Sequence, residues 1–382
     1  MAINTRSERL EYVDLDRIRR TVDGGPYDAV VVMSPENVPY YSGFYNMDLR
    51  SIPERVHFVV WSPHTDPTFV VIDRRASSLK PEDTFVADVR GYEGEAFVSI
   101  RVLAEVLTER GAAAGRVGIE GRNFPAGHLM ELQRLLPGAR VEDAFFFLES
   151  VRLIKTPAEV DVITRATKAA MDAVDTAFRA AKPGDSERAI SARMQYELLL
   201  NGCDQVAFPV FGSGDRTGWF HGLATDAPVE EGMILKTDFG GLLDGYYSDI
   251  ARTAVMGKAT DRQRDLHHKV TEVKHRIVAG IRPGMAASEV SRIGIQAYAD
   301  LGIEFKWNIL GHGLGLGVHE SPQLYTWIDD PLQPGMVMMI ETGYRDYPGD
   351  SFHVEDLIRV TETGAEYLLD VSAHEHLWEL GR

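Results

Sequence analysis

The order of the predicted elements after residue 155 constrains the fold of this chain most. Thr156-Pro157-Ala158-Glu159 is a capping box with proline at the first helical position, which marks the start of a long helix. Three further helices are predicted over 186–200, 260–281 and 288–301. Stretches rich in strand and turn residues, 206–256 and 307–371, follow the two helix pairs. The C-terminal part is therefore predicted as helix pair, sheet, helix pair, sheet, although no sequence repeat is obvious.

The first 150 residues alternate between predicted strands and helices. Runs rich in β-branched residues and bounded by turn residues predict strands at Tyr27–Met33, Val56–Trp61, Thr68–Asp73 and Val117–Glu120. Helical patterns occupy Ala96–Arg110 and Ala126–Leu136. This alternation predicts a small α/β domain over residues 1–150, and the boundary near residue 155 leaves residues 151–382 as a second domain.

The composition excludes several classes of function. The 382 residues include 57 Asp and Glu against 40 Lys and Arg, a net charge of −17, which argues against nucleic acid or an anionic membrane as a partner. No run approaches 18 apolar residues, and the polar N-terminus carries no signal-peptide pattern. The single Cys203 excludes an internal disulfide and a cysteine cluster that binds metal. We therefore expect a cytoplasmic protein.

The segment KTDFGGLLDGYYSDIARTAV predicts a hairpin with two facing aspartates. A turn centred between Leu243 and Asp244 would place Asp238 directly opposite Asp249. Directly opposed like charges destabilise a sheet, and a carboxylate pair in one pocket raises the pKa of one member. A surface pair relieved by water is the alternative interpretation of this hairpin taken alone.

A second hairpin, in MMIETGYRDYPGDSFHVEDLIRV, carries two facing glutamates. A turn around Pro348 places Glu341 opposite Glu355, although the longer loop leaves this register less secure. Two such pairs, one in each half of the C-terminal part, point to a bound multivalent cation that relieves the repulsion. Oxygen ligands favour Mn²⁺, Fe²⁺ or Co²⁺, with Zn²⁺ as an alternative.

The densest motif is the glycine-rich segment GHGLGLGVHESP over residues 311–322. It is not a dinucleotide-binding loop, because Val318 stands where that motif needs glycine. Glycines let the backbone pass close to a crowded site, and His312 could add a nitrogen ligand to the four carboxylates. His319 and His221 are weaker candidates, and an exposed loop histidine is the alternative interpretation of His221.

These residues resemble the creatinase/prolidase ("pita-bread") metallopeptidase family, which includes Xaa-Pro dipeptidases and Xaa-Pro aminopeptidases. The family pattern is two aspartates with ten residues between them, a glycine-flanked histidine, a glutamate in PGM-x-x-x-x-E and a glutamate in an ED pair. Its counterparts here are Asp238, Asp249, His312, Glu341 and Glu355. Segments 37–44 and 152–155 also resemble the family, so the likeness covers nearly the whole chain.

The resemblance implies an α+β architecture. A creatinase-like N-terminal α/β domain would precede a C-terminal pita-bread domain with two pseudo-twofold halves, each a helix pair and a sheet. Family members are commonly dimers, so a homodimer is expected as well.

The resemblance also implies a site for two divalent metal ions, with Mn²⁺ or Co²⁺ preferred and Fe²⁺ or Zn²⁺ as alternatives. Asp238 would chelate one ion, and Asp249 and Glu355 would bridge both. His312 and Glu341 would complete the coordination of the other ion. A hydroxide that bridges the two ions would be the nucleophile.

Three further roles are implied by the same resemblance. Glu341 would also shuttle protons between the attacking water and the leaving group. His221 and His319 would hold the substrate carbonyl and the tetrahedral intermediate.

Three positions near the site depart from the family pattern. Gln323 and His353 stand where arginines are common, and Thr342 stands where proline is usual. The loss of two arginines disfavours a dipeptide substrate with a free carboxylate. The predicted function is hydrolysis of an amide bond in a small peptide, of the Xaa-Pro dipeptidase or aminopeptidase type. The alternative is a non-peptidase enzyme of the same fold that acts on a small molecule, either a creatinase-like C–N hydrolase or a metal-dependent lyase.

Overall fold

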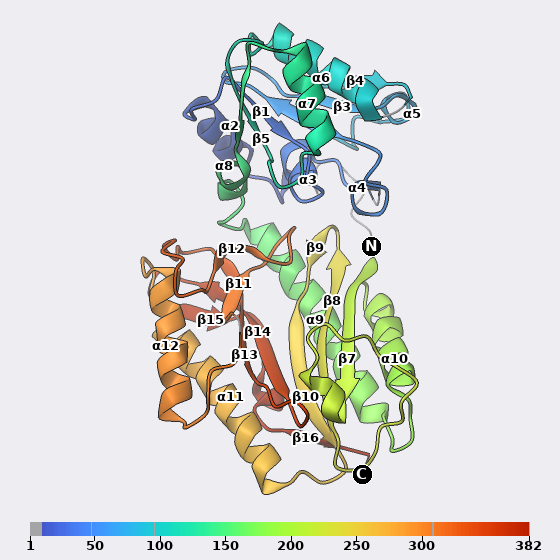
Figure 1. Ribbon diagram of the computed structural model, residues 1–382, viewed down its shortest axis with the longest axis vertical. Helices are drawn as coiled ribbons and strands as arrows, with labels where there is room; N and C mark the ends of the chain where they lie inside the picture. The colour runs from blue at the N-terminus through green and yellow to red at the C-terminus, as the bar shows by residue number, and fades with distance from the viewer. Residues whose placement is uncertain (1–9, 47, 95, 308, 382) are drawn as a thin grey trace. The chain divides into compact units, whose positions relative to one another are not determined.

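The computed structural model describes residues 10–46, 48–94, 96–307 and 309–381. Internal contacts divide the chain into two units, Met1–Arg152 and Leu153–Arg382, which are described separately below (Figure 1). In these residue ranges, no helix combines the length and the apolar character needed to cross a lipid bilayer.

The described part of the N-terminal unit contains a six-stranded sheet with strand order β4-β3-β2-β1-β5-β6. The strands are β1 (Ala29–Val32), β2 (Phe58–Trp61), β3 (Thr68–Ile72), β4 (Asp88–Tyr92), β5 (Arg116–Ile119) and β6 (Arg140–Asp143). The helices are α2 (Leu15–Asp23), α3 (Asn37–Ser42), α4 (Asp48–Ser51), α5 (Asp73–Ala76), α6 (Ala96–Glu109), α7 (Ala126–Leu135) and α8 (Phe145–Ser150). The four strands and two helices predicted here are all present.

Strands β4 and β6 were not predicted, and both lie at an edge of this sheet. Their sequences, DVRGY and RVED, alternate charged residues with single apolar ones and lack a β-branched run. An edge strand pairs on one side only and stays partly solvated, so its composition carries a weaker strand signal than a buried strand does.

The C-terminal unit contains, among the described residues, a ten-stranded sheet and two helix pairs (Figure 1). The main path of the sheet is β12-β11-β13-β14-β10-β8-β7. Its strands are β7 (Gln205–Ser213), β8 (Ile234–Leu243), β10 (Ile250–Met256), β11 (Gly311–Gly313), β12 (Glu320–Gln323), β13 (Val337–Tyr344) and β14 (Phe352–Val360). Three short strands pair beside this path, β9 (Tyr246–Tyr247), β15 (Ala365–Tyr367) and β16 (Trp378–Leu380). The helices are α9 (Pro157–Ala180), α10 (Glu187–Leu200), α11 (Asp261–Gly280) and α12 (Ala287–Asp300), with 3₁₀ turns η1 (Gly214–Gly218) and η2 (Ser372–His374).

Each helix pair covers its own half of the sheet. The predicted capping box at Thr156 and Glu159 starts α9, and a second one at Thr260 and Gln263 starts α11. One hydrophobic core joins α9 and α10 to β7, β8 and β10, and another joins α11 and α12 to β13 and β14. The unit is therefore two similar halves that share one sheet, in the predicted order.

Alternate residues of this sheet point to opposite faces. On β8, Leu235 and Phe239 enter the core beneath α9 and α10, and on β13, Met338 and Ile340 enter the core beneath α11 and α12. Because side chains alternate along a strand, the residues between these core positions face away from the helix pair that covers their own half of the sheet. Asp238 and Glu341 occupy such positions, so each side chain lies on the face of the sheet away from the helix pair of its own half.

The two halves meet where β10 pairs with β14, and that pairing is short. A single register pair, Ala251 with Glu355, joins these strands. Side chains of β10 satisfy further backbone groups of β14: Arg252 Nη1 donates to the Glu355 carbonyl at 2.7 Å, and Thr253 Oγ1 donates to the His353 carbonyl at 2.9 Å. The junction between the halves is thus held by side chains as much as by a backbone ladder.

The predicted register of the first hairpin is wrong by two residues. Asp238 lies opposite Ala251 instead of Asp249, because the turn is centred on Asp244-Gly245. Asp244 has φ 53° and Gly245 has φ 90°, the backbone conformation that a two-residue turn requires and that Asp-Gly supplies. The predicted centre would have forced Leu243 into that region.

The predicted register of the second hairpin is confirmed. Glu341 lies directly opposite Glu355 in the β13–β14 pairing.

Candidate metal centre

Three carboxylates lie in one row across four neighbouring strands. Asp238 on β8 is opposite Ala251 on β10, Ala251 is opposite Glu355 on β14, and Glu355 is opposite Glu341 on β13. Residues opposite one another in an antiparallel pair share a face of the sheet, so all four side chains point the same way. The small Ala251 leaves space between the carboxylates on either side of it.

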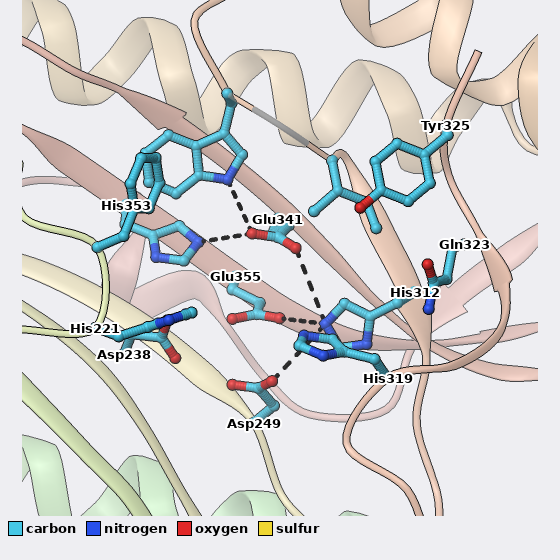
Figure 2. Close-up of a pocket in the computed structure, with 13 residues that line it drawn as sticks. His221, Asp238, Asp249, His312, His319, Gln323, Tyr325, Glu341, His353 and Glu355 are labelled. Carbon is cyan, nitrogen blue, oxygen red and sulfur yellow. Dashed lines mark hydrogen bonds and ion pairs between the residues drawn. The ribbon is translucent and has the colours of Figure 1, made fainter. Parts of the chain in front are cut away.

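Asp249 and His312 complete the cluster (Figure 2). Asp249 precedes β10, and its carboxylate, with those of Asp238 and Glu355, offers oxygens within 4.8 Å of one another. His312, on β11, forms a similar group with Glu341 and Glu355. The predicted register of the first hairpin is wrong by two residues, and side chains alternate between the two faces of a sheet. A shift of two residues keeps each side chain on its predicted face, so Asp238 and Asp249 still converge.

His312 presents one ring nitrogen to the carboxylates. Its Nε2 lies 3.4 Å from Glu355 Oε1, 3.8 Å from Asp249 Oδ2 and 3.9 Å from Glu341 Oε1. Its Nδ1 lies 3.0 Å from the Gly313 carbonyl, which can only accept a hydrogen bond. Nδ1 therefore carries the proton, and the lone pair of Nε2 faces the carboxylates.

Burial makes this cluster costly without a counter-charge. Asp249 and Glu355 are buried, and burial, reinforced by neighbouring carboxylates, raises the pKa of each well above its usual range. The pKa of Asp238 is raised for the same reasons. Asp249 Oδ1 and Glu355 Oε1 have no hydrogen-bond partner among the described residues, although both atoms are buried. Orphaned buried oxygens of this kind are rare unless an ion or water satisfies them.

Glu341 differs from the other carboxylates because one of its oxygens is already held. The Trp307 indole N–H donates to Glu341 Oε2 at 2.9 Å, and His353 Nε2 lies 3.2 Å from the same oxygen. Burial alone would raise the pKa of Glu341, but the hydrogen bond and charge of His353 lower it. Oε1 is left to face His312, as Figure 2 shows.

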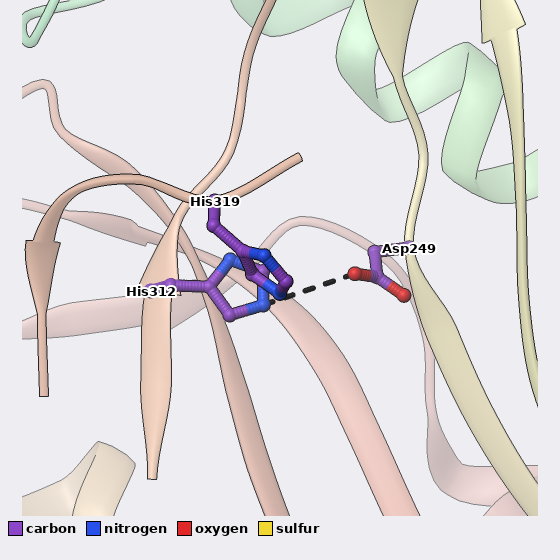
Figure 3. Close-up of side chains that lie close together, drawn as sticks. All are labelled: Asp249, His312 and His319. Carbon is purple, nitrogen blue, oxygen red and sulfur yellow. Dashed lines mark ion pairs between the residues drawn. The ribbon is translucent and has the colours of Figure 1, made fainter. Parts of the chain in front are cut away.

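The two remaining predicted histidines line the same pocket. The exposed His319 packs edge-on against His312, with ring centroids 4.4 Å apart, and a ring nitrogen comes within 4.8 Å of ligand atoms of His312 and Asp249 (Figure 3). Although the residue as a whole is exposed, partial desolvation of its ring, reinforced by His312, lowers the pKa of His319 to about 4. His221 is exposed on a loop residue with φ 48° and faces Asp238 across the pocket.

The pocket has a volume of about 340 Å³, within the range of small-ligand sites. Besides the predicted site residues, it is lined by Phe220, Trp307, Ile309, Gln323, Tyr325 and His353. Trp307 packs between Phe220 and His353, with ring centroids 5.2 and 4.6 Å away. Sequence reasoning assigned no role to Trp307 or Tyr325, which lie in loops without a local motif, so only the folded chain brings them to the site.

Buried ion pairs support the cluster from the other face of the sheet. Asp356 follows Glu355 and so points toward the helices, where Arg252 Nη2 binds it at 2.7 Å and Lys274 of α11 also contacts it. Although burial opposes it, these two cations hold the pKa of Asp356 well below its usual range. The ED pair thus places one acid on each face, one in the pocket and one in a structural anchor.

A second buried pair holds the glycine-rich segment. Lys155 Nζ lies 2.6 Å from Glu320 Oε2, with both side chains almost fully buried, and Glu320 Oε1 accepts from the Gly317 N–H at 2.8 Å. The loop between His312 and His319 is therefore fastened, through Glu320, to Lys155, which lies two residues before α9.

Comparison with known families covers both units. Residues 161–362 match the model of Metallopeptidase family M24, and residues 15–154 match the model of the Creatinase/Prolidase N-terminal domain. The chain is 28% identical over 358 residues to an Xaa-Pro dipeptidase of Pyrococcus furiosus, covering 93% of this chain and 97% of that protein. It is 32% identical over 254 residues to an Xaa-Pro dipeptidase of Pyrococcus horikoshii, covering 66% of this chain and 72% of that protein.

Solved structures agree. The prolidase from Pyrococcus horikoshii OT3 is similar with a TM-score of 0.81 and 27% identity, covering 93% of this chain and 97% of that structure. The prolidase from Pyrococcus furiosus gives a TM-score of 0.80 at 27% identity, covering 92% and 98%. The predicted family and the predicted α+β architecture, with its pita-bread domain, are confirmed. The chain therefore belongs to metallopeptidase family M24, carries a Creatinase/Prolidase N-terminal domain, and is a metallohydrolase.

Proposed function

We propose that this protein is a dinuclear metal-dependent peptidase that cleaves the bond between an N-terminal residue and proline. The observation that carries the proposal is the convergence of overlapping groups of carboxylates and imidazoles in one pocket of the C-terminal unit. The relatives named Xaa-Pro dipeptidase supply the substrate class.

The residues in the pocket fit a pair of divalent cations. Asp238, Asp249 and Glu355 form one group of donors, and His312, Glu341 and Glu355 form another. Glu355 belongs to both groups, as a bridging ligand must. The unsatisfied buried oxygens of Asp249 and Glu355 are the atoms that bound cations would satisfy. A set of mostly oxygen donors with one imidazole suits Mn²⁺ or Co²⁺, with Fe²⁺ or Zn²⁺ as alternatives.

Bound divalent cations would supply Lewis acidity, which polarises a carbonyl and acidifies a water molecule. The protein residues would do the rest. Glu341, held at Oε2 by Trp307 and His353, would accept the proton of the attacking water at Oε1 and release it to the leaving nitrogen. His319 and His221 would donate hydrogen bonds to the carbonyl oxygen as it gains negative charge. The lowered pKa of His319 keeps its ring neutral. The ring can then donate one hydrogen bond without placing a further positive charge beside the cations.

The test compares Ala-Pro-Ala with Ala-Ala-Ala as substrates of the purified protein. We expect cleavage of the proline peptide only, its loss after dialysis against EDTA, and its return with Mn²⁺ or Co²⁺. Metal analysis should find two ions per chain. An activity unaffected by chelation, or no bound metal and no rescue, would overturn the proposal. Cleavage of creatine-like amides without cleavage of peptides would instead favour a small-molecule enzyme.

The proposal treats residues 1–150 and 151–382 as separate domains, as the sequence predicted. The homodimer and the cytoplasmic location stay predictions.

A further inference from the structure

The described residues that line the pocket include no lysine and no arginine. They comprise the four carboxylates and His312, three further histidines, one amide and four apolar or aromatic residues. A carboxylate moved from water into such a site needs a cation or several aligned donors, because otherwise its desolvation is not compensated.

Two cations close to this lining, Lys236 and Arg345, are committed elsewhere. Lys236 is buried on β8, and its Nζ donates to the Trp219 carbonyl at 3.3 Å. Arg345 donates from Nε to the Gly218 carbonyl at 2.9 Å and stacks its guanidinium on Phe220, 4.5 Å from the ring centroid. Both therefore hold the 218–220 loop against the sheet.

Gln323 supplies the one carboxamide among the described residues that line the pocket. It lies directly opposite His312 in the β11–β12 pairing, so both side chains point into the pocket (Figure 2). Its side chain makes no hydrogen bond within the described part of the chain. A free carboxamide offers one acceptor and two donors, which is the complement of a peptide group. It gives an anion no compensating charge.

The wall beside Gln323 continues outward as an aromatic surface. Tyr325 lines the pocket and stacks on Trp327, with ring centroids 4.5 Å apart and planes at 19°. Trp327 is 70% exposed, so the pair connects the pocket to the surface of this unit. A chain that leaves the pocket past Gln323 would meet these rings.

We propose that Gln323 determines specificity for a neutral peptide group on the carboxyl side of the scissile bond, so that the preferred substrates are peptides of three or more residues. The inference rests on the proposed peptidase function and narrows it. The Gln323 amide pairs with the peptide group that follows proline, and a dipeptide, which has a carboxylate there, is disfavoured. Gln323 acts on substrate choice and takes no part in bond cleavage.

The experiment compares Ala-Pro, Ala-Pro amide and Ala-Pro-Ala on the Mn²⁺-loaded full-length protein. The first two differ only in the charge of the terminal group. We expect kcat/KM of the amide and the tripeptide to exceed that of the dipeptide by at least about tenfold, roughly 1.4 kcal/mol. A preference for Ala-Pro by a similar factor, or equal rates for all three, would overturn the inference while leaving the peptidase function intact.

Substitutions at Gln323 test the residue itself. Gln323→Arg should raise kcat/KM for Ala-Pro at least about tenfold relative to Ala-Pro amide, since a guanidinium pairs with a carboxylate in two hydrogen bonds. Gln323→Leu should lower kcat/KM for the amide with no gain for the dipeptide. The matched control is Gln296→Arg, at an exposed position of α12, which should leave the ratio unchanged. Unaltered selectivity in both Gln323 variants, with metal content and melting temperature preserved, would refute the role.

Binding separates this inference from the peptidase proposal. If none of the three compounds is cleaved by the metal-loaded protein, the peptidase proposal fails. Calorimetric titration of the same protein with Ala-Pro and Ala-Pro amide still decides the inference. Tighter binding of the amide would support it, and tighter or equal binding of the dipeptide would overturn it.

Discussion

At the residue scale, the two oxygens of Glu341 have different surroundings. Trp307 and His353 hold Oε2, and Oε1 faces His312. Groups that fix the orientation of a metal ligand commonly change metal affinity by about 10- to 100-fold when they are removed. In the proposed metal centre, Trp307 and His353 would therefore position Glu341.

Trp307→Phe keeps most of the ring packing and removes the N–H donor to Glu341. We expect Mn²⁺ affinity to fall by about tenfold, because Glu341 loses one of the two contacts that hold it. Competition against a fluorescent chelator measures the dissociation constant. Trp378→Phe is the matched control, since it removes an indole hydrogen bond to Ala373 outside the pocket. An equal loss of affinity in the two variants would contradict the role of Trp307.

His312 and His319 are the pair whose roles differ most in the proposal. His312→Ala should abolish turnover and lower the metal content, because a buried nitrogen donor is lost. His319→Ala should lower kcat by about 10- to 1000-fold with both ions retained, because it removes a donor to the developing oxyanion. Metal analysis by mass spectrometry alongside kinetics separates the two. Ligand atoms of His319, His312 and Asp249 lie within 4.8 Å of one another, which is close enough for one ion to contact all three. Equal metal loss in both variants would therefore show that His319 is a metal ligand.

At the scale of elements, the helix cap at the start of α9 lies near the buried ion pair that holds the glycine-rich segment. Glu159 completes the capping box with Thr156, accepts from the Tyr246 hydroxyl at 3.1 Å and lies near the buried Lys155–Glu320 pair. Burial raises the pKa of Glu159 to about 7. A titratable group at this end of the helix therefore lies near the ion pair that holds the glycine-rich loop.

Glu159→Gln tests the titration of this group through pH. The pKa of Glu159 is higher in the folded state than in the unfolded one, so its stabilising contribution is complete below the unfolded value. That contribution is lost as pH rises through about 7. Between pH 5 and 8, the wild type should lose on the order of 2 kcal/mol of unfolding free energy that the variant does not lose. Urea unfolding curves across this pH range measure it, and parallel curves for the two proteins would refute the assignment.

Lys155→Met breaks the buried pair that fastens the glycine-rich loop. We expect a loss of about 3 kcal/mol in unfolding free energy, since the buried Glu320 carboxylate loses the cation that lies beside it. Lys168→Met is the control, because the Lys168–Asp172 pair on α9 has side chains 58% and 45% exposed. That change should cost no more than about 0.5 kcal/mol. Similar losses for both would show that the buried pair adds nothing beyond a surface one.

Local pattern predicted the elements well where it coincides with burial or capping. The capping boxes at Thr156 and Thr260 and the acids on facing strands are short-range signals, and the structure contains them. The predicted register of the first hairpin is wrong because the position of the turn sets the register, and Asp244-Gly245 is a standard turn pair. Trp307 could not be found, since its contact with Glu341 spans 34 residues and depends on the folded loop.

At the scale of the whole molecule, the candidate metal centre draws on both halves of the C-terminal sheet and on no described residue of the N-terminal unit. Asp238 and Asp249 come from the first half, and His312, Glu341 and Glu355 from the second. Cations bound there would stabilise the C-terminal unit in particular.

Hydrogen exchange can locate that stabilisation. Adding Mn²⁺ at about 100 times its dissociation constant should stabilise the protein by about 2.7 kcal/mol. Amides of β8, β10, β13 and β14 should exchange more slowly, and those of β1 to β3 should not change. Glu355→Gln, which removes the carboxylate shared by both groups, should lose most of the protection. Protection spread evenly over both units would contradict a centre confined to the C-terminal sheet.

The short β10–β14 junction has a further consequence. One register pair and side-chain contacts, including the buried Arg252–Asp356 pair, join the two halves there, and carboxylates from both halves line one pocket. Metal ions bound by these carboxylates would link the two halves of the C-terminal sheet. Metal binding would therefore also stabilise the packing of one half against the other. We therefore expect the metal-free protein to keep each half folded and to loosen along this line first.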